Sequence, residues 1–464
     1  MQVPFAIESY RSRSAPWSTQ RCINGFSETA PNKNTKTPNV VYGSPGISSF
    51  TSGLSGSIRG SKLMGGVLYV VAGSGFYSIA SDGTATSIGS INTNFGLVSM
   101  DANLASPQQL CFVDGTDGWI YDTTNGLQQI VDADFQAADT VTFQDGYFIF
   151  NWNGTANFFI SNLNNGLAYT ATDYAAAEAT PDNTVAVYSS QQQLWVFKEL
   201  SFEVFYNSGN PDFPFERISG GVQPRGLAAA FTLTEDDNTL FFLGNDRIFY
   251  RANGFTPVRI STHAIEEELR KMSDVSDAYS YFITLSGHKF FYTVFPTGNA
   301  CFVFDVSTGL WHERESYGQD HFLGIAYAYA YNKHIIGDAF QGRLGELDLD
   351  SFTEFSNPML LTLTAPNIAF GRARIPHHKF EIEMETGVGN ASETDPMGWI
   401  DWSDDGGRTW SDAKPPANIG KVGEYIKRLR WTRLGSPRQR IYRFQTSSAV
   451  KKSVLGAYLN EDLG

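Results

Sequence analysis

GGVLYVVAGSGFYSIASDGTATSIG, residues 65–89, is the stretch that decides the fold. It predicts two short strands, Val67–Val71 and Phe76–Ala80, joined by the tight turn Gly73-Ser74-Gly75, and a third strand near Thr84–Ile88 after a second turn. Val, Ile, Tyr and Phe suit a pleated surface, and glycine supplies the positive φ that a tight turn needs. Three or four such strands make one antiparallel blade.

The same strand–turn–strand unit recurs along the chain. Further copies lie at residues 110–122, 141–152, 184–206, 240–251, 289–305 and 324–348. Repeats at an irregular period of roughly 40 to 60 residues are typical of a β-propeller, in which each blade buries its faces only against its neighbours. The repeats predict a propeller of about six blades, give or take one.

Two segments depart from this pattern. Ser261–Met272 predicts a short helix, because Ile265, Leu269 and Met272 fall on one stripe. From about Ser356 the sequence no longer follows the pattern of the blades. Strands are expected at residues 379–385, 399–402, 424–434, 439–446 and 454–459, and they predict an antiparallel sandwich. The whole chain therefore predicts an all-β protein with an irregular N-terminal arm (1–50) docked on the C-terminal domain, a β-propeller (51–355) and a β-sandwich platform domain (356–464).

Composition agrees with an all-β fold and excludes some functions. The chain holds 44 Gly and is 14% aromatic against 18% charged, a balance that favours strands over helices. Its net charge of −14 argues against a protein that coats nucleic acid. The three cysteines, Cys22, Cys111 and Cys301, are odd in number and widely spaced, which disfavours a disulfide scaffold or a zinc site.

The motifs that could carry catalysis have simpler structural explanations. SDDGGRTW (residues 403–410) fits the Asp-box pattern found several times in sialidases, but here it occurs once and outside the propeller, so we interpret it as a hairpin device. Glu381, Glu383 and Glu385 alternate along one strand, as expected for a solvated face rather than a catalytic carboxylate pair. The seven histidines show no metal-ligand spacing. We therefore expect no catalytic residues, no metal and no cofactor.

A basic run near the C-terminus is the main candidate interaction site. KRLRWTR (residues 427–433) interleaves basic and aromatic residues, a pattern that can bind nucleic acid but also suits the centre of a protein interface. Residues 421–464 carry ten Lys and Arg against three acids, so contact with an acidic surface of another subunit is the preferred interpretation, with a solvated strand face as the alternative. The candidate subunit or adaptor interface is Arg428, Arg430, Trp431, Arg433, Arg438, Arg440 and Arg443.

Four stretches, in order along nearly the whole chain, carry a family resemblance. They are QRCINGFSE (20–28) with GSPG (43–46), FFIS (158–161), the helix at 265–272, and RWTRLG (430–435) with Arg443-Phe444. Together they resemble the packaged DNA stabilisation proteins, which are the tail-hub or nozzle proteins (tail accessory factors) of short-tailed phages such as the Salmonella lambdoid podoviruses.

The resemblance implies a structural protein of the virion tail, assembled in the host bacterial cytoplasm and without enzymatic activity. It implies a homohexameric ring below the portal and adaptor that extends the DNA conduit, helps retain the packaged genome and anchors tail spikes or fibres. The implied partners are the portal-adaptor ring, a tail spike or fibre, and a tail needle or plug protein. Double-stranded DNA is expected to pass through without specific binding, with no small-molecule substrate and no membrane insertion by this chain.

A DNA conduit should repel DNA, and carboxylates on its wall would do so. The candidate acidic lumen consists of Glu235, Asp236, Asp237, Glu381, Glu383 and Glu385. Two competing functions stay open: a monomeric propeller that binds a glycan or a protein, and a sialidase-like propeller that acts on glycans.

Overall fold

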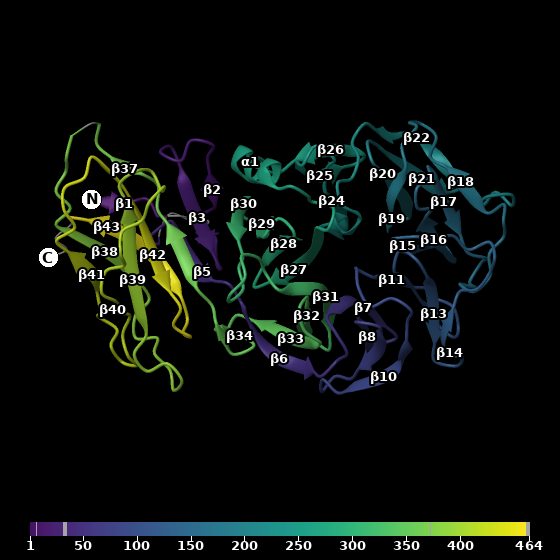
Figure 1. The fold of residues 1–464 in the computed structure, drawn as a ribbon, viewed down its shortest axis with the longest axis horizontal. Helices are drawn as coiled ribbons and strands as arrows, with labels where there is room; N and C mark the ends of the chain where they lie inside the picture. The colour runs from purple at the N-terminus through teal and green to yellow at the C-terminus, as the bar shows by residue number, and fades with distance from the viewer. Residues whose placement is uncertain (6, 31–34, 372, 461–464) are drawn as a thin grey trace.

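Strands dominate the residues that the computed structural model describes, namely 1–5, 7–30, 35–371 and 373–460 (Figure 1). Within these ranges there is one α-helix, α1 (His263–Lys271), where the sequence predicts it, and one short 3₁₀ helix, η1 (Ala230–Thr232). Thr262 caps α1, since its Oγ1 accepts a hydrogen bond from the Ile265 amide. Ile265 and Leu269 bury the apolar stripe of α1 in the propeller core.

In the described residues the propeller has seven four-stranded antiparallel blades, within the predicted range of six give or take one. Blades 1 to 3 consist of β7 (Ile58–Met64), β8 (Val67–Ala72), β9 (Gly75–Ile79) and β10 (Ala85–Ser90); β11 (Ser99–Ala102), β12 (Leu110–Val113), β13 (Gly118–Asp122) and β14 (Gly126–Gln129); and β15 (Val141–Gln144), β16 (Tyr147–Asn151), β17 (Asn157–Ile160) and β18 (Tyr174–Ala176). Residues 65–89, from which the propeller is predicted, lie in blade 1.

The next three blades repeat this arrangement. They consist of β19 (Thr184–Ser190), β20 (Gln193–Lys198), β21 (Phe202–Asn207) and β22 (Phe215–Gln223); β23 (Thr234–Asp236), β24 (Thr239–Leu243), β25 (Phe249–Asn253) and β26 (Thr256–Arg259); and β27 (Tyr279–Leu285), β28 (His288–Phe295), β29 (Ala300–Asp305) and β30 (Leu310–Glu313). At most junctions between blades the first strand contacts the first strand of the next blade, and the 3₁₀ helix η1 contacts β19 of blade 4 and β27 of blade 6.

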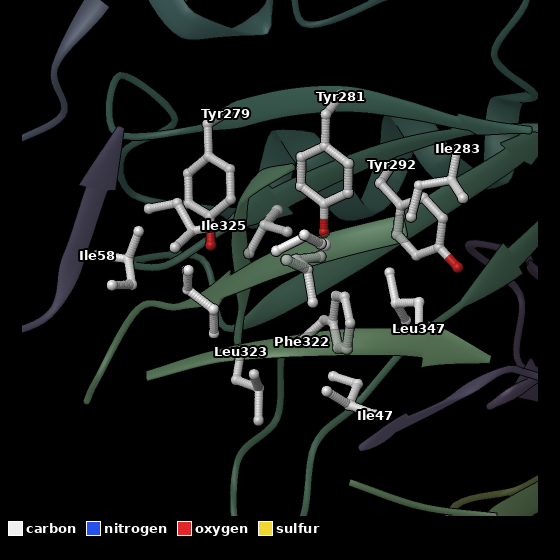
Figure 2. Packing of buried hydrophobic residues seen from close by; sticks show 14 of the residues in the cluster. Ile47, Ile58, Tyr279, Tyr281, Ile283, Tyr292, Phe322, Leu323, Ile325 and Leu347 are labelled. Atoms are coloured by element: carbon white, nitrogen blue, oxygen red, sulfur yellow. The ribbon is translucent and has the colours of Figure 1, made fainter. Parts of the chain in front are cut away.

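Blade 7 closes the ring with a strand from the other end of the chain. β31 (Gly324–Ala330), β32 (Lys333–Asp338) and β33 (Arg343–Asp348) are completed by β6 (Gly46–Ser52), which pairs antiparallel with β33. Figure 2 shows the core that this closure buries, in which Ile47 of β6 and Ile58 of β7 pack with Tyr281 and Tyr292 of blade 6. The propeller is therefore locked by apolar contacts between its first and last strands.

Side chains on the innermost strands accept hydrogen bonds from backbone N–H groups of the next blade. Ser99 Oγ accepts a hydrogen bond from the Val141 amide at 3.1 Å, and Asp101 Oδ2 accepts one from the Phe143 amide at 2.8 Å. One blade further, Thr142 Oγ1 accepts a bond from the Ser189 amide at 3.0 Å. Each blade thus covers an edge that an isolated sheet would leave unpaired.

The sandwich consists of two sheets that enclose a second core. One sheet has the order β4 (Gly25–Thr29), β5 (Asn39–Gly43), β43 (Ser453–Leu459), β38 (Lys379–Met384) and β41 (Leu429–Thr432), with β1 (Gln2–Val3) also on β43. The other runs β3 (Thr19–Ile23), β36 (Leu361–Thr364), β42 (Gln439–Thr446), β39 (Met397–Ser403) and β40 (Ala417–Asn418), with β2 (Tyr10–Arg11) on β3 and β37 (Ile368–Ala369) on β42. Phe380 and Tyr442 stack between the sheets with ring centroids 4.1 Å apart.

The N-terminal segment differs from the irregular arm that we expected. Its strands β1, β3, β4 and β5 are members of the two sandwich sheets, paired with β43, β36 and each other. A polar sequence with few apolar residues still forms strands here because the partner strands, more than 300 residues away, supply the hydrogen bonds and the core. The expected strand at residues 424–434 is likewise shorter, since β41 covers only Leu429–Thr432 and turns precede it.

The two units share a sheet and a buried charged seam. β3 pairs with β30 of blade 6 on one side and with β36 of the sandwich on the other, so the hydrogen-bonded ladder continues from propeller to sandwich. Across this seam Arg21 of β3 pairs with Glu313 and Glu315. Beside it, the buried Arg314 after β30 pairs at 2.8 Å with the buried Glu354 of β34 (Thr353–Glu354), which joins blade 6 to the extension of blade 7. β34 and β35 (Asn357–Pro358) extend blade 7 toward the sandwich.

Candidate interaction surfaces

The predicted basic site divides into exposed and internal residues. Arg430 on β41, Arg433 just after it and Arg438 just before β42 are exposed. Arg428 is also exposed, with its Nε 3.9 Å from Glu381 Oε1. Trp431 is buried in the sandwich core, where its Nε1 donates to the Pro415 carbonyl at 3.0 Å. The alternation along β41 therefore directs Leu429 and Trp431 inward and Arg430 outward.

The two arginines of β42 are held inside the sandwich. Arg440 is buried, binds both carboxylate oxygens of Asp404 at 2.7 Å and lies over the Trp402 ring. Arg443 pairs with Asp401 and lies over the Trp410 ring, with 4.0 Å from its Cζ to the ring centroid. These bidentate, stacked geometries occupy the guanidinium groups within the chain.

An exposed apolar loop precedes β41, which the sequence reasoning had included in a strand. In the loop at residues 421–428, Val422 and Tyr425 are each 70% exposed and Ile426 is 94% exposed. Lys421, Lys427, Arg428 and Arg430 surround them, with Glu424 as the one acid of the stretch from 421 to 430. Large apolar side chains that gather in one exposed loop are typical of an interaction surface. We call residues 421–430 the basic–apolar loop.

The predicted acidic lumen residues fall into two separate groups. Asp236 and Asp237, at the β23–β24 turn, contact Lys289 at 2.9 and 3.3 Å, and Asp237 also contacts Arg251 at 3.0 Å. Next to them, Glu235 accepts a hydrogen bond from Ser190. Their charge is therefore largely balanced within the propeller.

The second group lies on β38 in the sandwich. Glu381 is buried beside Arg428, and Glu383 contacts Lys36 and accepts a hydrogen bond from Tyr458 Oη at 2.8 Å. Glu385 contacts Lys451 at 2.8 Å, and this hydrogen bond lowers the pKa of its carboxyl group. The structure thus does not bring the six acids together.

A different acidic surface stands out on blades 1 to 4. Residues 63–197 contain twelve Asp and Glu and no Lys, Arg or His. This run without a basic residue is the sequence signal that indicates an acidic surface on these blades. In an antiparallel blade, the turn between the second and third strands and the link to the next blade emerge on the same face. On that face of blades 1 to 4 these segments are residues 73–74, 91–98, 114–117, 130–140, 152–156, 177–183, 199–201 and 224–233.

Hydrogen bonds join these segments into one surface, which we call the acidic face. Asn92 Nδ2 donates to Asp117 at 2.8 Å, the Gly115 amide donates to the Ala138 carbonyl at 3.1 Å, and Asn183 Nδ2 donates to Glu199 at 3.2 Å. Arg225 is the one Lys or Arg in these segments, and it pairs with Asp246 of the β24–β25 turn at 2.5 Å. The half-exposed or exposed carboxylates of the acidic face are Asp114, Asp117, Asp132, Asp134, Asp139, Glu178 and Glu199.

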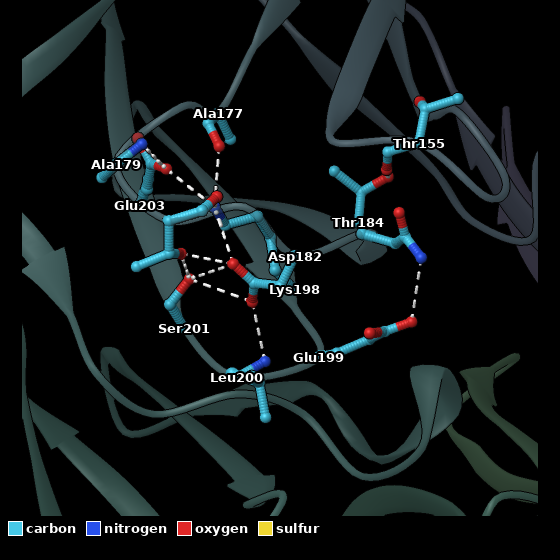
Figure 3. A network of polar contacts seen from close by, with 12 residues as sticks. Thr155, Ala177, Ala179, Asp182, Thr184, Lys198, Glu199, Leu200, Ser201 and Glu203 are labelled. Carbon is cyan, nitrogen blue, oxygen red and sulfur yellow. Dashed lines mark hydrogen bonds and ion pairs between the residues drawn. The ribbon is translucent and has the colours of Figure 1, made fainter.

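Beneath the acidic face, a buried ion network anchors the link between blades 3 and 4 (Figure 3). Lys198 is fully buried, contacts Asp182 at 3.1 Å and Glu203 at 3.0 Å, and donates to the carbonyls of Ala177 and Thr180. Burial opposes the charge of Asp182, but hydrogen bonds from Thr180 and Leu200 and the Lys198 ammonium lower its pKa. The network fixes the backbone of residues 177–183.

Among the described residues, three cavities of about 310 to 350 Å³ are large enough for a small ligand. One, of about 310 Å³, lies at the seam between propeller and sandwich and is lined by Phe26, His288 and Lys452 among others. A hydrogen bond at 2.7 Å to Asp305 raises the pKa of His288, and burial lowers the pKa of Lys452 to about 8. A second, of about 340 Å³, is lined by residues of β1, β5 and β43 among others, and the third, of about 350 Å³, lies at the propeller centre.

The side chains of the Asp-box motif form hydrogen bonds with the backbone of their own turn. In the Asp-box turn, Asp405 accepts hydrogen bonds from the amides of Arg408 and Thr409, and the Ser403 hydroxyl accepts one from the Gly407 amide. Over the described residues no group of His, Cys, Asp and Glu is arranged to hold a metal, and Cys22, Cys111 and Cys301 are buried free thiols. None of the described helices is long and apolar enough to cross a membrane.

Comparison with known proteins gives a family match for each unit. The sequence model of the bacteriophage P22 Gp10 β-propeller matches residues 1–352, and that of the bacteriophage P22 Gp10 β-sandwich matches residues 361–461. No curated protein matches.

Solved structures share only a distant likeness. Virginiamycin B lyase from Staphylococcus aureus is 10% identical over 70% of this chain and 99% of its own, with a TM-score of 0.44. PorZ, a surface component of the type-IX secretion system of Porphyromonas gingivalis, is 11% identical over 80% of this chain and 46% of its own, with a TM-score of 0.39. Likenesses of this size carry no argument about function.

Proposed function

We propose, from the premise that this chain belongs to the family of bacteriophage P22 Gp10, that it is the subunit of a ring in a phage tail. The family match confirms the resemblance to packaged DNA stabilisation proteins, a family of phage structural proteins, and makes the chain a virion component. The observation that carries the proposal is that this match covers both the propeller and the sandwich.

The ring, in this proposal, is a homohexamer attached below the portal-adaptor ring of a short-tailed phage. It extends the DNA conduit, helps to retain the packaged genome, and anchors tail spikes or fibres and a needle or plug protein. The shared sheet and the ion pairs of Arg21 across the seam support this role, because a subunit that bears load between an adaptor and a spike must not bend between its two halves. A structural role without enzymatic activity is part of the proposal.

The conduit is proposed to carry double-stranded DNA without specific binding. A subunit of net charge −14 repels the phosphate backbone, so DNA can slide past the ring. If the candidate lumen residues contribute, replacing Asp237 and Glu385, each with a side chain 45% exposed, by Lys should slow genome ejection without preventing assembly. Ejection in vitro, followed by a DNA-binding dye, measures this. Wild-type kinetics in the variant would remove these residues from the lumen.

The central cavity favours one alternative, a propeller that binds a glycan as a monomer. Its wall includes the ion pair of Lys62 and Asp101 at 2.8 Å and the hydroxyl groups of Thr142, Ser189 and Ser280, which suit a sugar. A glycan screen tests this alternative. Two results together would favour this alternative over the ring: the chain binds a glycan and loses that binding in Lys62→Met, and it is never found in a phage tail.

The direct test of the proposed function uses virus particles. A phage that lacks this protein should fill its heads but release the DNA, and adding the purified chain to such heads should restore stable, infectious particles. Empty heads that the purified chain cannot rescue, or full particles that persist without it, would contradict a role in genome retention.

A further inference from the structure

In the part of the chain that the structure describes, the basic–apolar loop presents exposed apolar side chains among cations. It exposes Val422, Tyr425 and Ile426 and carries four cations against Glu424. The apolar surface favours burial, and the surrounding cations favour an acidic partner. The loop belongs to the sandwich at one end of the molecule, as the position of β41 shows in Figure 1.

The acidic face offers the complementary surface at the opposite end. Blades 2 to 4 lie farthest from the sandwich in Figure 1. Among its carboxylates the acidic face exposes Phe95 (77%), Val131 (84%) and Leu200 (62%), so it too combines charge with apolar side chains. The two surfaces match in both respects, but they are too far apart to meet within one chain.

We propose that the basic–apolar loop of one copy docks on the acidic face of a second copy, head to tail. The inference rests on the proposed ring function and adds the surfaces that join neighbouring subunits. A contact between two different surfaces is heterologous, and repeated contacts of this kind close into a ring when the rotation between neighbours allows. Charge complementarity sets the register, and the apolar side chains at the centre supply most of the affinity.

Two variants of the full chain, each with uncharged polar replacements on one of the two surfaces, test the two surfaces separately. The loop variant carries Val422→Ser, Ile426→Ser and Lys427→Gln, and the face variant carries Asp117→Asn, Asp134→Asn and Glu178→Gln. All six positions are exposed or half-exposed, so both variants should fold, which circular dichroism and thermal unfolding verify. The matched control, Asp82→Asn with Asp145→Asn, removes two exposed carboxylates from the opposite face of the propeller.

Sedimentation velocity at low salt and high protein concentration measures self-association. The wild-type chain should associate, more weakly as salt rises, and each variant should associate roughly tenfold or more weakly, while the control matches the wild type. The decisive sample is an equimolar mixture of the two variants. The loop variant keeps an intact acidic face and the face variant keeps an intact loop, so the mixture should form a dimer of about twice 51.2 kDa that grows no further.

Several outcomes would overturn the inference. These are a wild-type chain that stays monomeric, variants that associate like the wild type, and a mixture that forms no dimer although the wild type associates. Loss of binding to a purified adaptor, or to anionic vesicles, by the loop variant alone would reassign the loop to that partner. Because the particle rescue tests the proposed function independently, these failures are distinguishable from failure of the ring proposal.

Discussion

At the scale of the residue, buried charges hold the parts of this chain in place. Lys198 with Asp182 and Glu203, and Arg314 with Glu354, are ion pairs whose members are almost fully buried. Removing one partner of such a pair is strongly destabilising because it leaves an uncompensated charge in a medium that solvates it poorly. The acidic face therefore depends on a cation that lies beneath it.

Replacing Lys198 by Met should lower the free energy of unfolding by about 3–5 kcal/mol, because Asp182 and Glu203 would remain buried without a cation. Equilibrium unfolding in guanidinium chloride measures the change. Arg217→Met is the matched control, since Arg217 contacts the same Glu203 from a half-exposed position and should matter by less than about 1 kcal/mol. Equal effects of the two substitutions would contradict the assigned importance of burial.

His312 predicts a pH dependence of stability. It is buried, neither ring nitrogen has a hydrogen-bond partner among the described residues, and burial lowers its pKa to about 4. Between about pH 6.5 and 4 the unfolded chain binds a proton at this residue and the folded chain does not, so stability falls as the pH falls. The slope reaches about 1.4 kcal/mol per pH unit.

Replacing His312 by Leu should remove this contribution. The variant should lose less stability than the wild type between pH 7 and pH 5, as measured by denaturant unfolding at each pH. His288, whose pKa is raised by Asp305, acts in the opposite direction in both proteins, so the difference between them isolates His312. Parallel pH profiles would show that His312 is solvated in solution.

At this scale the sequence predicted residue types but not their partners. The run at 427–433 identified Arg428 and Arg430 as exposed cations, but it could not show that Trp431 lies in the core or that Arg440 binds Asp404. Which carboxylate faces which arginine depends on strand register, and the register is set by residues far away in the chain. The exposed Ile426 was missed for a related reason, because an apolar residue next to β41 looks like part of a strand.

At the scale of the element, β6 is the strand on which the propeller depends. It is the outer strand of blade 7, and Ile47 at its start packs into the core shared by blades 6 and 7 (Figure 2). The other three strands of blade 7, β31 to β33, were predictable because residues such as Gly, Asn and Asp mark the turns between them locally. β6 itself carries no such signal, because it pairs with a strand at the other end of the propeller, and so the sequence left the blade count and the closing strand open.

Replacing Ile47 by Ala should lower the free energy of unfolding by about 2–5 kcal/mol, because the side chain is fully buried and its neighbours cannot collapse into the cavity. Hydrogen exchange should show faster exchange in β6 and β33 before other strands are affected. Ser49→Ala, an exposed change on the same strand, is the control and should leave both quantities near the wild type. Uniformly faster exchange over all blades would contradict a local closure.

At the scale of the whole molecule, two rigidly joined units carry opposite charge. The sheet that runs through β30, β3 and β36 makes the sandwich an extension of blade 6, and the acidic face and the basic–apolar loop lie at opposite ends of the result (Figure 1). The two-unit organisation was predictable from the change in sequence texture near Ser356. The shared sheet was not, because β3 belongs to a segment that looks irregular until both of its partners are in place.

The ring that we propose for this chain is tested most directly by the mass of its assembly. Native mass spectrometry of the purified chain, alone and mixed with its adaptor, distinguishes the possible states. If the chain forms this ring, we expect a species near six times 51.2 kDa, either by itself or as a sixfold ring on the adaptor. A chain that stays at 51.2 kDa with the correct adaptor present would contradict the ring and favour a propeller that works as a monomer.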